Sequence, residues 1–336
     1  MNTQKTRLVG IAALGAAAAL ALAGCSGAPA SNGAGGDGDV TLRLAHVYEA
    51  AHPVETCGVK TLQDELDGSG ITVKSFPAAQ LGSEAEALEQ VATGALDIAV
   101  AGSSFLGTWY EPAAVFDAAY LFDDVEHFNS TLNSDLMAGV FDELASQSGL
   151  RVQSGWYYGT RHVTANKEIS SPADMKGLKI RTPDAPMYLK NTEVMGGTAT
   201  PMALSEVYLG LQQGVIEAQE NPLPTIATAK LNEVQKVVNL TGHMVQGVFL
   251  TTQESLGNRL SAEQNASFTA ALESAAAAVQ ECVETQESEI IATWSSDGSI
   301  AINDAVKRDE FAKAAVSEFS KNPVWGELYS DIRAGK

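Results

Sequence analysis

Two arginines and one asparagine stand at the ends of predicted strands in the middle of the chain. Arg161 follows an aromatic segment, Arg181 ends "LKIR", and Asn221 ends "EAQEN". Ligands of parallel α/β sheets bind beyond the carboxyl ends of the strands. A guanidinium forms paired hydrogen bonds to a carboxylate, and an amide both donates and accepts. The pattern therefore predicts a carboxylate site, and the alternative for each arginine is an ion pair with a local acid such as Asp184 or Glu220.

Other kinds of chemistry have little support in the sequence. The chain has no G-x-S-x-G, S-x-x-K, H-E-x-x-H, C-x-x-C or Walker motif, and its five histidines show no metal-ligand spacing. The glycines at 33, 35 and 38 match G-x-G-x-x-G, but no predicted strand precedes them and no predicted helix follows. We therefore predict no enzyme activity, no metal and no cofactor. The formal net charge of -20 also disfavours a nucleic-acid partner, because a polyanion is repelled by such a surface.

The first 39 residues predict a leader and a tether. Residues 1–24 carry two basic side chains and then a short apolar run, which is typical of a secretion signal. The run ends in "LAGC", a pattern similar to the bacterial lipoprotein box, in which Cys25 becomes the lipidated N-terminus on the outer face of the cell membrane. The alternative is ordinary cleavage after Ala23. Residues 25–39 are rich in Gly, Ala, Ser and Asp and predict a flexible linker.

From residue 40 onward, short apolar segments alternate with helical ones. Such alternation predicts parallel sheets, and the number of segments indicates two α/β lobes. We expect helices at 83–93, 125–147 and 223–238, and a long one at 262–295 that either lies across both lobes or contacts another subunit. The expected strands lie at 40–47, 71–77, 97–105, 150–158, 178–181, 198–201, 216–219 and 246–256.

Cys57 and Cys282 are the two cysteines that remain after the leader. An extracytoplasmic compartment is oxidising and permits a disulfide between them. Two separately buried thiols explain the sequence equally well, so both alternatives stay open.

Three segments resemble the DctP-type extracytoplasmic solute receptors of TRAP transporters. The segments are "SFPAAQLGSEAEALEQVATGALDIAV", "GTRHVTANKEISSPADMKGLKIRTPDAPMY" and "TATPMALSEVYLGLQQGVIEAQENPLPTIATAKLNEVQKVVNLTGH". The resemblance implies a two-lobed clamshell of the periplasmic-binding-protein class II type, with hinge strands and a long helix that spans both lobes. Lobe I would comprise 40–158 plus 247–286, and lobe II 159–246 plus 287–336. Such a receptor closes on an organic acid and delivers it to the small and large membrane subunits of a sodium-driven transporter.

The resemblance also assigns roles to residues. Arg181 corresponds to the arginine that clamps the ligand carboxylate, Arg161 to a second pocket arginine and Asn221 to an amide that contacts the ligand. The remaining positions that the resemblance or the local pattern places near the ligand are His46, Glu84, Ser103, Trp156, Tyr158, Leu204, Glu220 and His243.

The exact ligand stays open between a sugar acid and a C4-dicarboxylate. Gly102 stands where sialate receptors carry an acid, which disfavours sialate, and Leu204 replaces a more common Phe. Trp156 and Tyr158 either stack on the ligand or pack at the end of a strand. Two other functions remain as alternatives, namely a receptor that serves a sensor protein and a secreted α/β enzyme that acts on organic acids.

Overall fold

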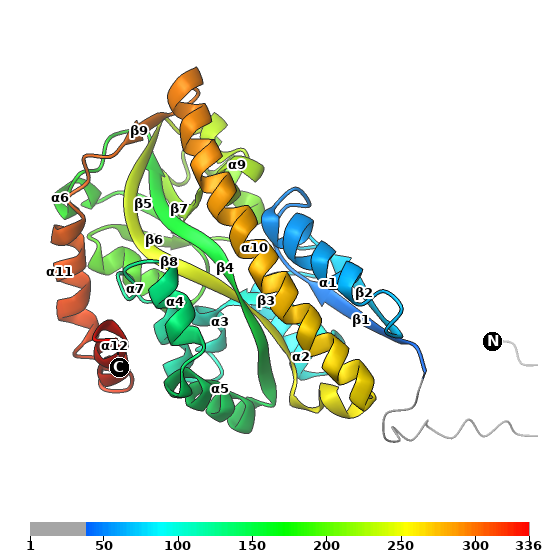
Figure 1. The fold of residues 1–336 in the computed structure, drawn as a ribbon. Coiled ribbons are helices and arrows are strands. Elements are labelled where there is room, and N and C mark those ends of the chain that lie inside the picture. The colour runs from blue at the N-terminus through cyan, green and yellow to red at the C-terminus, as the bar shows by residue number, and fades with distance from the viewer. Residues whose placement is uncertain (1–37, 336) are drawn as a thin grey trace, which may run out of the picture. The chain divides into compact units, whose positions relative to one another are not determined.

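The computed structural model describes residues 38–335, and nine strands within that range form one mixed sheet (Figure 1). The strand order is β2-β1-β3-β8-β4-β7-β5-β6, and β9 pairs with β8. The strands are β1 (Val40–Ala45), β2 (Ile71–Phe76), β3 (Ile98–Gly102), β4 (Leu150–Ala165), β5 (Lys179–Thr182), β6 (Thr198–Pro201), β7 (Ala218–Pro222), β8 (Val237–Gln253) and β9 (Ala301–Asn303).

Helices of very different lengths surround this sheet. The α-helices are α1 (Lys60–Glu65), α2 (Glu84–Ala92), α3 (Ser103–Leu106), α4 (Val125–Leu132), α5 (Asp135–Ser148), α6 (Pro172–Met175), α7 (Pro186–Val194), α8 (Val207–Gln212), α9 (Leu223–Thr228), α10 (Ala262–Asp297), α11 (Arg308–Phe319) and α12 (Gly326–Arg333). Five short helical segments complete the set, namely η1 (Val54–Val59), η2 (Glu111–Asp117), η3 (Leu204–Glu206), η4 (Leu231–Glu233) and η5 (Glu254–Arg259).

Two long antiparallel strands, β4 and β8, connect the two halves of the sheet. One half contains β1, β2 and β3, which are parallel to one another, and the other contains the parallel strands β5, β6 and β7. Strand β8 is antiparallel to both β3 and β4, and β4 is antiparallel to β7. The prediction of parallel sheets is therefore correct for each half and wrong for the strands that join them.

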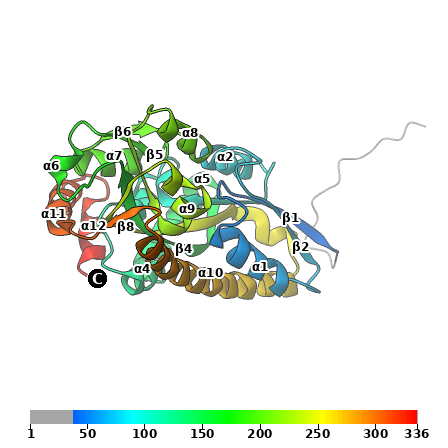
Figure 2. The ribbon, with the colours of Figure 1, turned by 90° about the horizontal axis from the view of Figure 1, so that it is seen from above.

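Helix α10 lies along both halves (Figures 1 and 2). It packs on β4, on α1, on η1 near its middle at Val279 and Cys282, and on α9 and β9. Ser261 and Gln264 begin the helix with a capping box, and Gly298 ends it in the left-handed conformation. Of the two expectations for this segment, the structure therefore supports a helix that spans the fold.

Several predicted boundaries are wrong. The helix expected at 125–147 divides into α4 and α5, because Ser134 caps a new helix by accepting a hydrogen bond from the Met137 amide. The helix expected at 223–238 ends at Thr228, and β8 begins at Val237, where the chain pairs with Ala165 of β4. The strands expected at 150–158 and 246–256 are parts of the much longer β4 and β8. The strand expected at 97–105 ends at Gly102.

The hydrophobic core comprises two clusters. The larger one extends from β1 and β3 through β4 and β8 to α11 and α12. The smaller one lies among α8, α9 and the end of α10, and its buried members are Val207, Leu211, Ile216, Leu223, Ile226, Leu231, Val238, Trp294 and Ile300. The larger cluster contains residues of both halves of the sheet, for example Leu42 of β1 and Ile180 of β5, so the two clusters do not correspond to the two halves.

Cys57 and Cys282 form a disulfide between η1 and α10. The bridge joins positions that are 225 residues apart in the sequence, so it attaches the long helix to the half that contains β1. Within residues 38–335, no helix is both long and apolar enough to cross a membrane. The predicted leader, Cys25 and most of the linker lie outside the described residues.

Candidate ligand-binding site

A cavity of about 530 Å³ opens between the end of β5 and the start of α2. Strand β5 ends at Thr182, and Pro183 follows it, so Arg181 is the last charged side chain before the chain leaves the sheet. Ser83 and Glu86 begin α2 with a capping box and so fix its first turn. The lining residues are Val47, Ala79, Gly82, Ser83, Glu84, Ala85, Glu86, Phe105, Arg181, Pro183, Asp184, Pro201, Met202, Ala203, Leu204, Ser205 and Glu206.

Arg181 is buried in this cavity and has no carboxylate partner in the part of the chain that the structure describes. Its residue is 3% exposed, and its Nε donates a hydrogen bond to the Met202 carbonyl oxygen at 2.8 Å. None of the ion pairs found among residues 38–335 includes Arg181. Burial lowers the pKa of Arg181 to about 10, although the charge of Glu220 acts in the opposite direction. The guanidinium is therefore desolvated and still available to an anion.

Arg161 has the opposite environment, because its donors are already occupied. It is 2% exposed, and its Nη2 donates to Oε1 of Glu220 at 2.8 Å while its Nε donates to Oε2. Its Nη1 donates to Oε1 of Gln246 at 2.8 Å. The local ion pair considered in the sequence analysis is thus correct for Arg161, and Arg181 does not pair with Asp184.

Glu220 is the centre of this ion-pair network. His243 contacts it through Nε2, which lies 3.1 Å from Oε2. Burial raises the pKa of Glu220, but the charge of Arg161 and the hydrogen bond with His243 outweigh burial and lower that pKa to about 2. Burial also lowers the pKa of His243 below its usual value. Glu220 is therefore a permanent anion that neutralises Arg161.

Asn221 and Tyr158 belong to a second buried polar chain. Nδ2 of Asn221 donates to Oε1 of Gln219 at 2.6 Å, and the Tyr158 hydroxyl donates to Oδ1 of Asn221 at 3.4 Å. The same hydroxyl lies 2.5 Å from Oγ1 of Thr225, which His52 also contacts at 3.0 Å. The Tyr158 ring lies between Tyr48 and Arg161, with its centroid 4.8 Å from that of Tyr48. The structure therefore groups Tyr158 and Asn221 with Arg161.

The reason why these side chains meet differs from the prediction. Arg161 does not end a strand but lies inside β4, where it is paired with Pro222 in the antiparallel register. Arg181 is paired with Gln219 in the parallel register of β5 and β7. Because β7 pairs with both β4 and β5, it brings the two arginines and Asn221 close together in the sheet, even though β4 runs in the opposite direction.

Glu84 approaches from the other half of the fold, in the first turn of α2. Its residue is partly exposed in the cavity, but the surrounding protein withdraws its carboxyl from water and raises its pKa to about 7. The charges of Arg181 and Arg161 lower that pKa, and the charge of Asp117 raises it. Glu84 is therefore a carboxyl that exists in both protonation states near neutral pH.

Three buried residues that the sequence did not indicate form a hydrogen-bonded group beside Arg161, namely Asp117, Tyr188 and Gln246. Gln246 donates through Nε2 to Oδ1 of Asp117 at 3.1 Å and to the Tyr188 hydroxyl at 2.5 Å. Asp117 also accepts a hydrogen bond from the Ser104 amide at 2.7 Å, and burial raises the pKa of Asp117 to about 6. Its sequence signal is a single acid within the apolar segment 113–122.

Gly102 is surrounded by this supporting group. A Cβ atom at that position would lie 2.2 Å from the Tyr188 hydroxyl and 3.0 Å from Oδ2 of Asp117. No side chain fits there without movement of Tyr188, so the packing around this position requires a glycine.

The other predicted residues have mixed positions. Leu204 lines the cavity, whereas Ser103 is fully buried at the start of α3. His46 is 2% exposed, and its Nε2 contacts Glu55 at 2.8 Å, so this ring is engaged within its own half. Trp156 packs against Gly58 and Val279 in the core beneath α10, which supports the packing alternative for that side chain.

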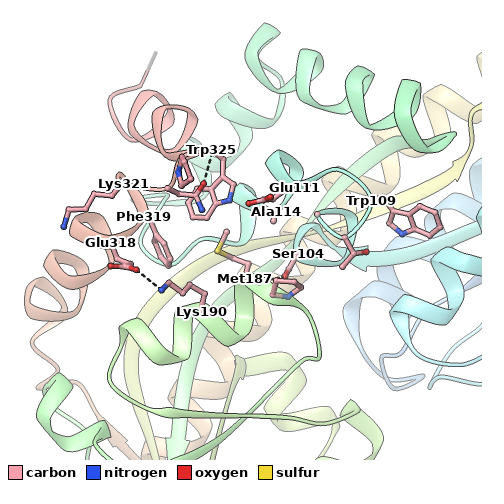
Figure 3. A pocket seen from close by; sticks show the side chains of 15 residues that line it. Ser104, Trp109, Glu111, Ala114, Met187, Lys190, Glu318, Phe319, Lys321 and Trp325 are labelled. Carbon is pink, nitrogen blue, oxygen red and sulfur yellow. Dashed lines mark hydrogen bonds and ion pairs between the residues drawn. The ribbon is translucent and has the colours of Figure 1, made fainter.

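A larger cavity of about 950 Å³ lies elsewhere, among α3, η2, α7 and α11 (Figure 3). Phe319, Trp325 and Met187 line it, together with the ion pair of Lys190 with Glu318, whose Nζ and Oε1 are 2.7 Å apart. Neither buried arginine reaches it. Charge and burial therefore indicate the smaller cavity as the ligand site, despite its size.

Known proteins resemble this chain along most of its length. The family model described as bacterial extracellular solute-binding protein, family 7 (DctP), matches residues 45–322. The sialic acid-binding periplasmic protein SiaP of Vibrio cholerae is 34% identical over 286 residues, which cover 84% of this chain and 89% of that protein.

Solved structures of TRAP periplasmic solute-binding proteins share the fold. The protein from Actinobacillus succinogenes with bound L-galactonate is 28% identical, with a TM-score of 0.82 over 88% of this chain and 98% of that one. The protein from Roseobacter denitrificans with bound 3-deoxy-D-manno-oct-2-ulosonic acid is 25% identical, with a TM-score of 0.83 over 88% of this chain and 99% of that one.

Proposed function

This chain belongs to family 7 of the bacterial extracellular solute-binding proteins, and we propose that it captures a small organic acid through a single carboxylate clamp, Arg181. The observation that carries the proposal is a desolvated guanidinium, in a cavity of about 530 Å³, that has no carboxylate partner among residues 38–335. A ligand carboxylate would supply the missing charge and accept paired hydrogen bonds from the two Nη atoms.

Arg161 acts mainly as support in this scheme. Its ion pair with Glu220 and its hydrogen bond to Gln246 hold its guanidinium beside Tyr158 and Tyr188. From there its charge acts on the bound acid, whereas Arg181 makes the direct contact. Asn221 and Tyr158 would contact the rest of the ligand only after these side chains rearrange, because neither lines the cavity and both are hydrogen-bonded to other side chains.

The proposed mechanism is closure of two lobes on the ligand. Lobe I would comprise 40–158 plus 247–286, and lobe II 159–246 plus 287–336. Arg181 and Asn221 then belong to lobe II, and Glu84 approaches from lobe I. A ligand that contacts both lobes stabilises the closed form, because its contacts are complete only there.

The receptor is expected to deliver its ligand to TRAP membrane subunits from outside the cytoplasm. We propose that lipidation of Cys25 keeps it at the outer face of the cell membrane. Metabolic labelling with a lipid analogue tests this anchor, with labelled wild type and unlabelled Cys25→Ser as the expected result. An unlabelled wild type would instead favour simple secretion.

A thermal-shift screen of organic acids tests the function as a whole. A ligand that binds only the folded state raises the melting temperature, and calorimetry then gives the affinity. We expect at least one sugar acid or related hydroxy acid to bind and to be recovered unchanged by mass spectrometry after prolonged incubation. Binding of none of the acids contradicts the proposal, and chemical turnover of a bound acid would favour an enzyme.

A further inference from the structure

The charges that line the proposed cavity are unevenly distributed. Arg181 is the single basic residue of the lining, whereas Glu84, Glu86, Asp184 and Glu206 are acidic. Glu86 is engaged by the capping box, where its Oε2 accepts hydrogen bonds from the Ser83 amide and hydroxyl at 2.8 Å each. The cavity thus offers one cationic position surrounded by carboxylates.

Arg161 adds little positive charge to this balance. Glu220 neutralises it through two hydrogen bonds, and both side chains are almost completely buried. Asp117 is a further negative charge near the site, and its repulsion raises the pKa of Glu84. A first ligand carboxylate would therefore neutralise Arg181, and a second one would find no unpaired cation in the cavity.

Glu84 lies opposite the clamp. Its carboxyl interacts electrostatically with Arg181, which lines the same cavity, and accepts a hydrogen bond from the Gly102 backbone, while it has no side-chain hydrogen-bond partner among residues 38–335. A ligand hydroxyl can hydrogen-bond to this carboxyl in either of its protonation states. A ligand carboxylate in the same place would be repelled by the ionised form of Glu84 and would be desolvated at the same time.

We propose that Glu84 selects ligand charge, so that the receptor accepts hydroxylated acids with one carboxylate and rejects their dicarboxylate counterparts. This inference rests on the proposed function, because it presupposes that Arg181 holds a carboxylate. It decides between the two ligand classes that the sequence leaves open, a sugar acid and a C4-dicarboxylate, in favour of the sugar acid. It also makes Glu84 a determinant of specificity rather than one contact among several.

Matched pairs of sugar acids test the proposal directly. L-Galactonate and the corresponding aldarate, galactarate, have the same carbon chain and differ in one terminal group, a hydroxymethyl or a second carboxylate. The same comparison is made for gluconate and glucarate, and for succinate against its monocarboxylate analogue 4-hydroxybutyrate. Calorimetry on the mature wild-type protein at about pH 8.5, where Glu84 with its pKa of about 7 is ionised, should show binding to be weaker by more than about tenfold for each dicarboxylate.

Two variants on α2 distinguish a local effect of Glu84 from a general effect of charge. Glu84→Gln keeps the size of the side chain and should reduce the preference for the monocarboxylate by about tenfold or more. Glu89→Gln removes the same charge from an exposed position on the same helix, outside the cavity, and should leave the preference unchanged. Equal loss of preference in both variants would contradict the local role of Glu84.

The outcomes separate this inference from the proposed function. Dicarboxylates that bind as tightly as their monocarboxylate partners would overturn the charge selection and leave the receptor function intact. Failure of every acid in the thermal-shift screen and in these pairs would refute both proposals together.

Discussion

Arg161 and Arg181 are equally buried, but the protein stabilises the charged form of Arg161 and destabilises that of Arg181. Glu220 stabilises the charge of Arg161, whereas burial lowers the pKa of Arg181 below its usual value. A base with a lowered pKa opposes folding at neutral pH, because its charged form is more stable in the unfolded chain. Arg181 therefore favours binding at the expense of stability, which is typical of functional sites.

We expect Arg181→Ala to abolish or severely weaken binding of the organic acid identified by the screen. Removal of one partner from a desolvated charge pair costs about 3–5 kcal/mol, or roughly 10² to 10³·⁵ in affinity. Arg181→Lys should also bind poorly, because an ammonium cannot form the paired hydrogen bonds. Calorimetry measures both variants, and Arg151→Ala is the control, since this half-buried arginine at the start of β4 pairs with Asp142 and Glu254 and does not line the cavity. A loss of less than fivefold for Arg181→Ala would contradict the clamp.

The two arginines should also differ in their effects on the ligand-free protein. Arg181→Ala should leave the melting temperature unchanged or raise it, since a poorly solvated charge is removed. Arg161→Ala should lower it clearly, because Glu220 would remain buried without its main cation. Thermal unfolding without ligand checks this, and equal destabilisation by both variants would show that Arg181 also has a structural role.

At the scale of elements, α10 is attached to the fold at two places. The disulfide from Cys57 to Cys282 fixes it to η1. Farther along, Oε1 of Glu287 accepts a hydrogen bond from the Thr160 amide at 2.8 Å, and Oε2 accepts one from the Tyr157 hydroxyl at 3.2 Å. The second contact lies where β4 passes from one proposed lobe to the other.

Gly159 is required at this crossing of β4. Its φ of +125° is a conformation that other residues rarely adopt. A Cβ atom there would also lie 2.7 Å from Cβ of Pro222 and 2.9 Å from Oε1 of Glu287. The same glycine thus permits the backbone turn and the contact with α10.

The contact of Glu287 with β4 should depend on pH. Burial raises the pKa of Glu287 to about 7, and nearby Glu284 adds to this effect, although the hydrogen bonds from Thr160 and Tyr157 lower it. A carboxyl with a raised pKa contributes stability that is complete below the pKa of the unfolded chain and is lost as pH rises through about 7.

We therefore expect Glu287→Gln to gain in melting temperature relative to the wild type as pH increases from 5 to 8. The neutral amide avoids the cost of a buried charge, which the wild type incurs at the higher pH. Glu289→Gln, an exposed position on the same helix, serves as the control and should follow the wild type. A constant difference between Glu287→Gln and the wild type across this range would show that Glu287 does not titrate there.

The disulfide should contribute measurably to stability. Replacement of both cysteines by serine is expected to cost about 2–4 kcal/mol, since the bridge restricts a long loop of the unfolded chain. Denaturant unfolding measures this, and a reductant should lower the stability of the wild type but not of the double variant. Reductant-insensitive unfolding of the wild type would indicate that the bridge does not form in solution.

At the scale of the whole molecule, the sequence predicts where helices and strands lie better than it predicts the direction of the strands or the residues at which elements end. Local signals locate β1, α2 and α10 within a few residues, because capping boxes and alternating segments are local properties. The antiparallel direction of β8 and the length of β4 depend on long-range pairing, for which the chain carries no local signal. The prediction extended the helix after Leu223 into Val237 and Val238, although these buried residues pair with β4.

The residues of the site could likewise be predicted from local patterns, but their contacts could not. The strand-end pattern identified Arg161, Arg181 and Asn221, and the local acid Glu220 was named as an alternative partner. Glu220 neutralises Arg161 because β4 pairs with β7, and this long-range pairing cannot be read from the local sequence. The supporting residues Tyr188 and Gln246 come from distant segments, so their contact could not be inferred from spacing.

The last prediction concerns motion between the proposed lobes. The chain would cross between them near Tyr158–Gly159, near Gln246–Gly247 and within α10. Hydrogen bonds of the structure span the proposed division, for example Ser104 Oγ accepting from the Met187 amide at 3.0 Å and Asn191 Nδ2 donating to the Asp117 carbonyl at 2.7 Å. Opening has to break some of these bonds, so the ligand-free protein should exchange between open and closed forms rather than lock in one.

Saturating ligand should therefore reduce the radius of gyration, because its contacts with Arg181 and Glu84 are complete only in the closed form. X-ray scattering with and without a ligand confirmed by calorimetry measures the change, and Arg181→Ala, which should not bind, provides the control for any effect of the added acid itself. Distances between spin labels on exposed positions of each half, Glu89 and Lys230, show whether the lobes approach each other. An unchanged radius together with unchanged label distances on binding would mean that the ligand is held without closure, and the clamshell mechanism would be wrong.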